Sequence, residues 1–169
     1  MKRILAICLA LMLTLSLAAC GGEQPNGTTT AATNAGTKAP LALDMPTVYQ
    51  KFQQAVVLPE MLELNESLML DFCGIQATDV KQAIVVVCAD SLRADEIWLV
   101  EAVDEAAAQR IEDLAHGRLD QKDAESITYS PEQNAIVKQA ELIREGNYII
   151  MIVSPDVQAL AQVIRAEMQ

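Results

Sequence analysis

Apolar residues alternate with polar ones, or form short runs rich in β-branched side chains, in four segments of the later part of the chain. Such segments are typical of β-strands. They are residues 81–89, 94–102, 142–145 and 148–153. Short polar turns at Asp90-Ser91 and Gly146-Asn147 join them in pairs, and glycine tolerates the positive φ that a tight turn needs. The pattern therefore predicts two β-hairpins.

Apolar residues three and four positions apart predict helices between and after these hairpins. Asp104 is a good N-cap for the first of them, which Gly117 is expected to weaken. Ser130-Pro131-Glu132-Gln133 has the form of a capping box and predicts a short helix that runs to about Gln139. A final helix is expected to start at Ser154-Pro155.

Two short helices are expected before the first hairpin. Pro46 suits the first position of a helix, which is broken at residues 58–61. Asn65 then caps a second short helix, and Gly74 closes it.

The resulting order, β-β-α-β-β-α after the N-terminal helices, predicts a single α+β domain over residues 45–169. We expect a four-stranded, mainly antiparallel sheet with the two main helices on one face. Strands 81–89 and 148–153 are apolar on both faces, so the second face also needs a cover. The short N-terminal helices are the favoured cover, and a partner surface is the alternative.

The first 20 residues carry a different pattern. A basic start is followed by an apolar run that is too short to span a bilayer, and small residues precede Cys20, which is typical of a signal peptide over residues 1–19. Leu17-Ala18-Ala19-Cys20 closely resembles the bacterial lipobox, whose cysteine accepts a diacylglyceryl group before cleavage. The resemblance implies a protein anchored by lipid on Cys20 to the outer, extracytoplasmic face of the cell membrane. The alternative is a plain secreted protein.

Residues 20–44 would then hold the lipidated cysteine and a linker rich in Gly, Thr, Asn and Ala. This composition predicts a flexible tether with a root-mean-square reach of about 27 Å. Removal of the signal peptide takes away Lys2 and Arg3, leaving 10 basic residues against 23 acidic ones and a net charge of −13. This charge repels phosphate backbones and anionic lipids, so nucleic acid is not an expected partner. Membrane attachment therefore depends on the lipid and not on a basic patch.

Cys73 and Cys88 are the cysteines of the expected domain. Outside the cell they could form a disulfide, or both could be buried thiols, and the sequence leaves these alternatives open. Two cysteines at this spacing and a single histidine do not predict a metal site, and no motif predicts a cofactor.

The remaining candidates for chemistry are few. His116 is the only histidine and is interpreted as a helix-surface residue and not as a catalytic base. Asp95 and Glu96 are successive strand residues, so their side chains should point to opposite faces. Trp98 and Tyr148, on strands expected to be adjacent, could line a small pocket, although core packing is the favoured interpretation. No catalytic residues are predicted.

Several short motifs occur here in one order: Leu58-Pro59-Glu60-Met61, Cys73-Gly74-Ile75, Ala94-Asp95-Glu96-Ile97, Arg118 to Gln121, Tyr129-x-Pro131-Glu132-Gln133 and Gly146-Asn147-Tyr148. Together they resemble the small lipoproteins catalogued as domain of unknown function 4358, typical of Gram-positive anaerobes. The resemblance covers about residues 45–169. It departs at Cys73, where a tyrosine is expected before Gly-Ile, and it implies no catalytic residues.

These observations favour a membrane-anchored, non-enzymatic module that binds a protein partner or a small ligand. One alternative is a cell-envelope enzyme that uses carboxylates, with Glu96, Glu101 or Asp104 as candidates. Such an enzyme needs two of these carboxylates to converge in one concave pocket. A structural spacer in an envelope complex is the other alternative.

Overall fold

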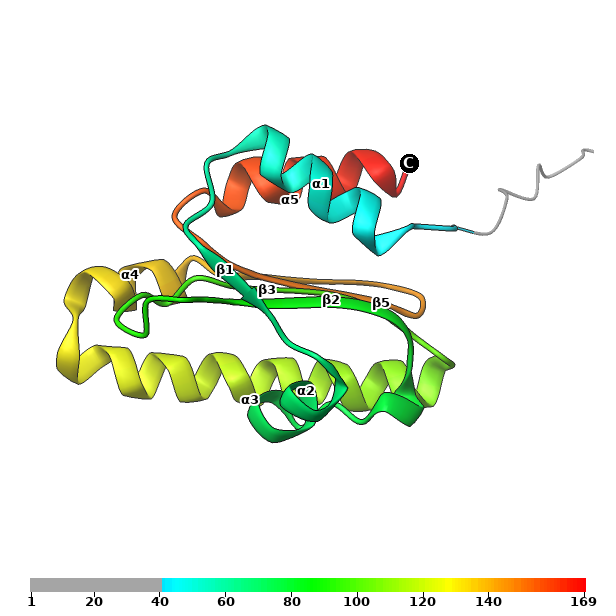
Figure 1. Ribbon diagram of the computed structural model, residues 1–169, viewed down its shortest axis with the longest axis horizontal. Helices are drawn as coiled ribbons and strands as arrows, with labels where there is room; N and C mark the ends of the chain where they lie inside the picture. The colour runs from blue at the N-terminus through cyan, green and yellow to red at the C-terminus, as the bar shows by residue number, and fades with distance from the viewer. Residues whose placement is uncertain (1–40) are drawn as a thin grey trace, which may run out of the picture. The chain divides into compact units, whose positions relative to one another are not determined.

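A five-stranded antiparallel sheet lies at the centre of residues 41–169, the part of the chain that the computed structural model describes (Figure 1). The strand order across the sheet is β1-β2-β3-β5-β4. The strands are β1 (Met61–Glu63), β2 (Val80–Cys88), β3 (Glu96–Ala102), β4 (Glu141–Glu145) and β5 (Tyr148–Val153). The predicted signal peptide, Cys20 and the linker up to residue 40 lie outside the described residues.

Both predicted hairpins are present, but the predicted number of strands is wrong. The fifth strand, β1, pairs with the end of β2 through Met61–Cys88, Leu62–Val87 and Glu63–Val86. It has three residues and follows Pro59, so its sequence was interpreted as a helix break and not as a strand. This short strand forms one wall of the cavity described below.

Five α-helices and one 3-10 turn surround the sheet in the described part of the chain. They are α1 (Met45–Ala55), α2 (Glu66–Cys73), η1 (Ala77–Asp79), α3 (Glu105–Tyr129), α4 (Pro131–Lys138) and α5 (Val157–Glu167). The predicted caps are found: the side chains of Asn65, Asp104 and Ser130 each accept a backbone N–H at a helix start. Asp44 caps α1 in the same way, which was not predicted from the sequence. Gly74 ends α2 with a φ of +74°.

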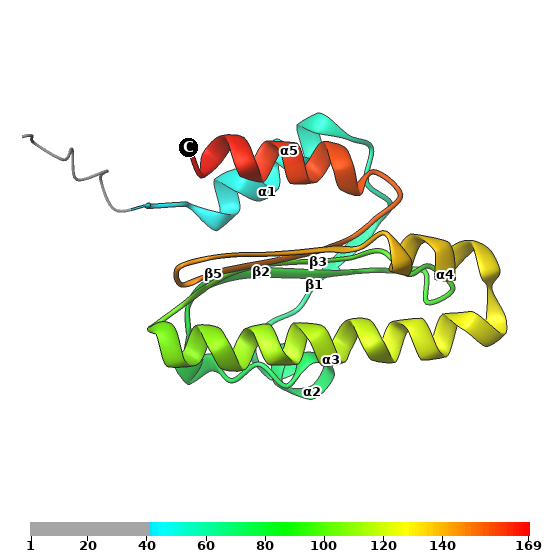
Figure 2. The same cartoon turned by 180° about the vertical axis from the view of Figure 1, so that it is seen from behind.

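The helices cover both faces of the sheet (Figures 1 and 2). α3 lies on one face together with α2, whereas α1 and α5 lie side by side on the other. The two main helices, α3 and α5, are therefore on opposite faces, and the prediction that they share one face is wrong. Strands β3 and β5 are buried along their whole length, so one long helix is needed on each side. The sequence favoured both short N-terminal helices as the cover of the second face; α1 lies there beside α5, whereas α2 lies on the face of α3.

Each face has its own hydrophobic core. The core under α3 contains Trp98, Val100, Ile111, Ile149 and Met151 among others. The core under α1 and α5 includes Met45, Phe52, Leu99, Ile150 and Leu160. Residues 40–169 form one compact unit, and both cores consist entirely of residues within it.

The last residues of the predicted linker pack against this unit. Leu43 is buried, and its backbone N–H donates to the Tyr148 hydroxyl at 3.2 Å. The same hydroxyl donates to the backbone oxygen of Leu41, and the Gln82 amide donates to the backbone oxygen of Leu43 at 2.7 Å. The chain is therefore fixed to the domain from Leu41 onward.

None of the helices in residues 41–169 is both long enough and apolar enough to cross a membrane. The longest, α3, has 25 residues and continues through Gly117, where the sequence predicted a weakening. A hydrogen-bonded helix tolerates an interior glycine at a cost of about 1 kcal/mol relative to alanine.

Candidate ligand-binding site

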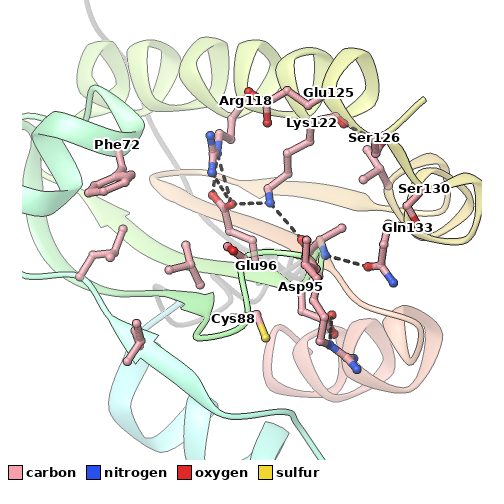
Figure 3. Close-up of a pocket in the computed structure, with 18 of the residues that line it drawn as sticks. Phe72, Cys88, Asp95, Glu96, Arg118, Lys122, Glu125, Ser126, Ser130 and Gln133 are labelled. Atoms are coloured by element: carbon pink, nitrogen blue, oxygen red, sulfur yellow. Dashed lines mark hydrogen bonds and ion pairs between the residues drawn. The ribbon is translucent and has the colours of Figure 1, made fainter. Parts of the chain in front are cut away.

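A cavity of about 900 Å³ lies on the α3 face of the sheet, at the end where β2 stops and β3 begins. Its walls come from β1, α2, the second half of α3 and α4, with the turn between β2 and β3 closing one side. Segments as far apart in the chain as those of Phe72 and Gln133 thus meet around one space (Figure 3). The β2–β3 hairpin places Glu96 at the floor, because Glu96 is the first residue of β3 and points toward α3.

The floor is a buried cluster of one carboxylate and two cations. Glu96 is fully buried, and the side chains of Arg118 and Lys122 are only 16% and 11% exposed. Arg118 binds Glu96 through two nitrogens, Nε to Oε1 at 3.0 Å and Nη2 to Oε2 at 2.9 Å. Lys122 Nζ lies 2.8 Å from Oε2, and the Trp98 indole N–H donates to Oε1 at 2.8 Å.

The spacing of the two cations explains their convergence. Arg118 and Lys122 are four residues apart on α3, so they lie on the same face of the helix. Lys122 also donates to the backbone oxygen of Ala94 at 3.0 Å, which ties α3 to the start of β3. The Gln133 side chain of α4 accepts the Ala94 N–H at 2.8 Å, so α3, α4 and β3 are held together at this point.

The cluster keeps Glu96 ionised. Burial acts to raise the pKa of this carboxyl, but the hydrogen bond from Arg118 and the positive charges of Lys122 and Arg118 outweigh burial and lower the pKa. The pKa of Arg118 is raised, because its hydrogen bond to Glu96 and the Glu96 charge outweigh the opposing effect of its own burial. Glu96 and Arg118 are therefore both charged at neutral pH.

A second ion pair lies on the other side of the strand end. Asp95 is buried, and its Oδ2 accepts from Arg93 Nε at 3.0 Å. Its Oδ1 is buried without a hydrogen-bond partner among the described residues. Asp95 and Glu96 point in different directions in Figure 3, but Asp95 lies just before β3 and both residues line the cavity, so they are not on opposite faces of a strand as predicted.

The mouth of the cavity is apolar. Four large hydrophobic side chains that line it are exposed: Leu62 (52%), Phe72 (58%), Leu92 (81%) and Tyr129 (86%). They come from β1, α2, the β2–β3 turn and the end of α3. Leu64, Leu68, Val87 and Val137 continue the apolar lining inward. Two exposed acids, Glu63 and Glu125, also lie on the lining.

Trp98 and Tyr148 do not line a common pocket, which corrects the sequence-based suggestion. Trp98 pairs with Met151 across β3 and β5 and is buried in the core under α3. Tyr148 pairs with Glu101, three residues further along β3, and belongs to the core under α1 and α5. The two aromatic side chains lie on opposite faces of the sheet, and neither lines the cavity.

The three candidate carboxylates do not converge either. Glu96 lies in the cavity floor, whereas Glu101 faces the opposite core, where it accepts from Lys81 and Gln82. Burial acts to raise the pKa of Glu101, but these hydrogen bonds outweigh it and lower the pKa. Asp104 caps α3 by accepting the Ala107 N–H at 2.8 Å. This arrangement does not support the carboxylate-enzyme alternative.

The two cysteines are free thiols in the structure. Cys73 is buried at the end of α2, and burial together with the Glu96 charge raises its pKa to about 12. It is therefore an unreactive thiol. Cys88 is half-buried at the end of β2 and lines the cavity.

His116 is exposed on α3, as the sequence predicted. Within residues 41–169 no group of three or more His, Cys, Asp or Glu side chains could hold a metal ion.

Sequence reasoning found Glu96 but missed its cationic partners. The signal was present in the spacing, since Arg118 and Lys122 occupy one face of a helix. However, the sequence does not show which strand end that face covers.

The fold and the cavity define a small α+β protein with helices on both faces of an antiparallel sheet and a concave site at one end of it. The chain belongs to the family described as Domain of unknown function (DUF4358), whose model matches residues 54–154. It matches no curated protein and no solved structure.

Proposed function

We propose that this protein is a membrane-anchored extracytoplasmic lipoprotein whose domain binds a small ligand in the cavity between β1, α2, α3 and α4. The observation that carries the proposal is the cavity itself. Its volume of about 900 Å³ falls in the range of about 300–1,000 Å³ typical of small-molecule sites. Its lining is also typical of such sites, with apolar walls around a small number of fixed polar groups.

Ligand binding explains the apolar mouth better than a structural spacer does. Large hydrophobic side chains that gather around one opening are unusual on a protein surface unless that surface binds something. Here four of them surround a hollow with a buried charged floor. A spacer role needs neither the hollow nor the charge.

The test uses residues 41–169, which hold both cores, and the neutral fluorescent probe N-phenylnaphthylamine. We expect saturable binding of the probe, with a Kd at least several-fold higher for Phe72→Ser. Leu70→Ser is the matched control, because Leu70 is exposed on the same helix but does not line the cavity. Absence of saturable binding, or equal loss in both variants, would contradict the proposed site.

The anchor is supported by the lipobox-like sequence that ends at Cys20. Two acyl chains on this residue would hold the protein stably at a membrane. Cys20→Ser in the full chain is expected to release the protein from the membrane fraction or to leave it unprocessed. Unchanged lipid labelling and membrane retention of this variant would refute the anchor.

A further inference from the structure

The charges on the cavity floor do not balance. Two cations, Arg118 and Lys122, face a single carboxylate, Glu96, and all three are largely or fully buried. Arg93 does not add to this excess, because Asp95 pairs with it. Burial of an unmatched positive charge is costly unless an anion compensates it.

The two cations also have hydrogen-bond donors to spare. A guanidinium has five N–H groups and an ammonium has three. Arg118 uses its Nε and one Nη2 proton on Glu96 and one Nη1 proton on Gln121. Lys122 uses one proton on Glu96 and one on the Ala94 oxygen. Two protons of Arg118 and one of Lys122 thus have no acceptor within residues 41–169.

Other acids near the cavity do not remove the excess on the floor. Glu125 contributes a charge near Arg118, but it is exposed and accepts a hydrogen bond from Gln121 at 2.8 Å. Glu63 is exposed on β1. Both carboxylates are on exposed residues, where water screens them more strongly than it screens the floor.

We propose, on the basis of the ligand-binding function above, that the cavity takes an amphipathic organic anion. A carboxylate or phosphate head would bind Arg118 and Lys122 on the floor. The apolar body would lie along Leu68, Phe72 and Val87 toward the hydrophobic mouth. Arginine suits this role because its planar fork binds either kind of head with paired hydrogen bonds.

Trp98 provides a direct readout of the floor. It is the only tryptophan in the sequence, and its indole N–H donates to the Glu96 carboxylate that the ligand head would approach. An anion bound to Arg118 and Lys122 changes the field around this indole, so its emission should shift on binding.

The experiment titrates residues 41–169 with octanoate, octyl phosphate, octanol and octylamine while Trp98 emission and the heat of binding are followed. We expect octanoate or octyl phosphate to bind at least about tenfold more tightly than octanol, as one charge-assisted hydrogen bond allows. The tighter of the two anions identifies the head group. Arg118→Gln should raise the Kd of that anion about tenfold or more and leave octanol unchanged.

Arg110→Gln is the matched control, because Arg110 lies on the same helix but pairs with Asp79 outside the cavity. If thermal melting shows that Arg118→Gln is not folded, Lys122→Gln is used in its place. This variant keeps the two-nitrogen contact between Arg118 and Glu96. Glu96→Gln should bind the anion more tightly than the unmodified protein, because it removes the competing carboxylate.

The outcomes separate the two proposals. Octanol binding as tightly as the anions, or octylamine binding most tightly, would overturn the anionic ligand and leave the ligand-binding cavity in place. Equal weakening by Arg118→Gln and Arg110→Gln would place the anion elsewhere and also overturn it. Failure of all four compounds and of the neutral probe to bind would overturn both proposals.

Discussion

The Glu96 carboxylate accepts hydrogen bonds or ion pairs from three side chains while it is fully buried. We predict that Glu96→Gln destabilises the protein by about 3 kcal/mol at pH 7, because it leaves two buried cations without a counter-charge. Because the folded state lowers the pKa of Glu96, its stabilisation is present above the ordinary glutamate pKa. The stabilisation is lost as pH falls through the lower pKa of the folded state.

Urea unfolding of both proteins at pH 7 and at pH 3 checks this prediction. The difference in unfolding free energy between the two proteins should shrink at pH 3, because this pH lies below the ordinary glutamate pKa, where the stabilisation from ionised Glu96 declines. A difference that stays constant between these pH values would show that the charge of Glu96 contributes nothing to stability.

At the same scale, the register between β3 and β5 decided which relations between candidate site residues could be predicted from the sequence. Side chains alternate between the faces of a strand, so Asp95 and Glu96 were expected on opposite faces; they point apart, but both line the cavity because β3 begins only at Glu96. Trp98 and Tyr148 lie on different hairpins, and their relative register depends on how β3 meets β5. That pairing is fixed by long-range packing, which no local pattern in the sequence reveals.

At the scale of elements, the two glycines of the α2–α3 region should respond oppositely to substitution. A Cβ at Gly117 would meet nothing within 4 Å, so Gly117→Ala should stabilise the protein by about 0.5–1 kcal/mol through helix propensity. Gly74 has a φ of +74°, and a Cβ there would lie 2.9 Å from Leu114 Cδ2. Gly74→Ala should therefore destabilise by about 1–2 kcal/mol.

Thermal or urea unfolding of the two variants measures both effects. A loss of stability in Gly117→Ala would mean that the fold requires the conformational flexibility that Gly117 gives to α3. An unfolding free energy that does not change in Gly74→Ala would show that α2 can end without a residue in the left-handed backbone conformation.

The elements themselves were largely predictable, because caps and turns are local chemistry. Asn65, Asp104 and Ser130 start helices where the sequence placed them. Strand β1 was missed, since its stability comes from pairing with β2 and not from its own three residues. The faces taken by α3 and α5 were also mispredicted, because both faces of the sheet are apolar and local patterns do not choose between them.

At the scale of the whole molecule, the family match begins later and ends earlier in the chain than the folded unit does. The match covers residues 54–154, but α1 and α5 lie almost entirely outside it. These two helices supply Met45, Val48, Phe52, Leu160 and Ile164 to one of the two cores. We predict that residues 54–154 alone do not unfold cooperatively, because they leave one apolar sheet face bare.

Near-ultraviolet circular dichroism during a thermal melt tests this, with residues 41–169 as the comparison. The shorter chain should lack a sharp transition and should show weak tertiary signal. A cooperative transition at the same temperature as that of residues 41–169 would mean that α1 and α5 are dispensable for the fold.

The contacts of the Tyr148 hydroxyl with Leu41 and Leu43 have a consequence for access. They secure the entering chain at the β4–β5 turn (Figure 1), whereas the residues that line the cavity lie at the other end of β3. From Glu101 to Glu96 the strand spans about 17 Å. The point where the chain enters the domain and the cavity therefore lie at opposite ends of β3, so attachment through the N-terminal side would leave the mouth of the cavity uncovered.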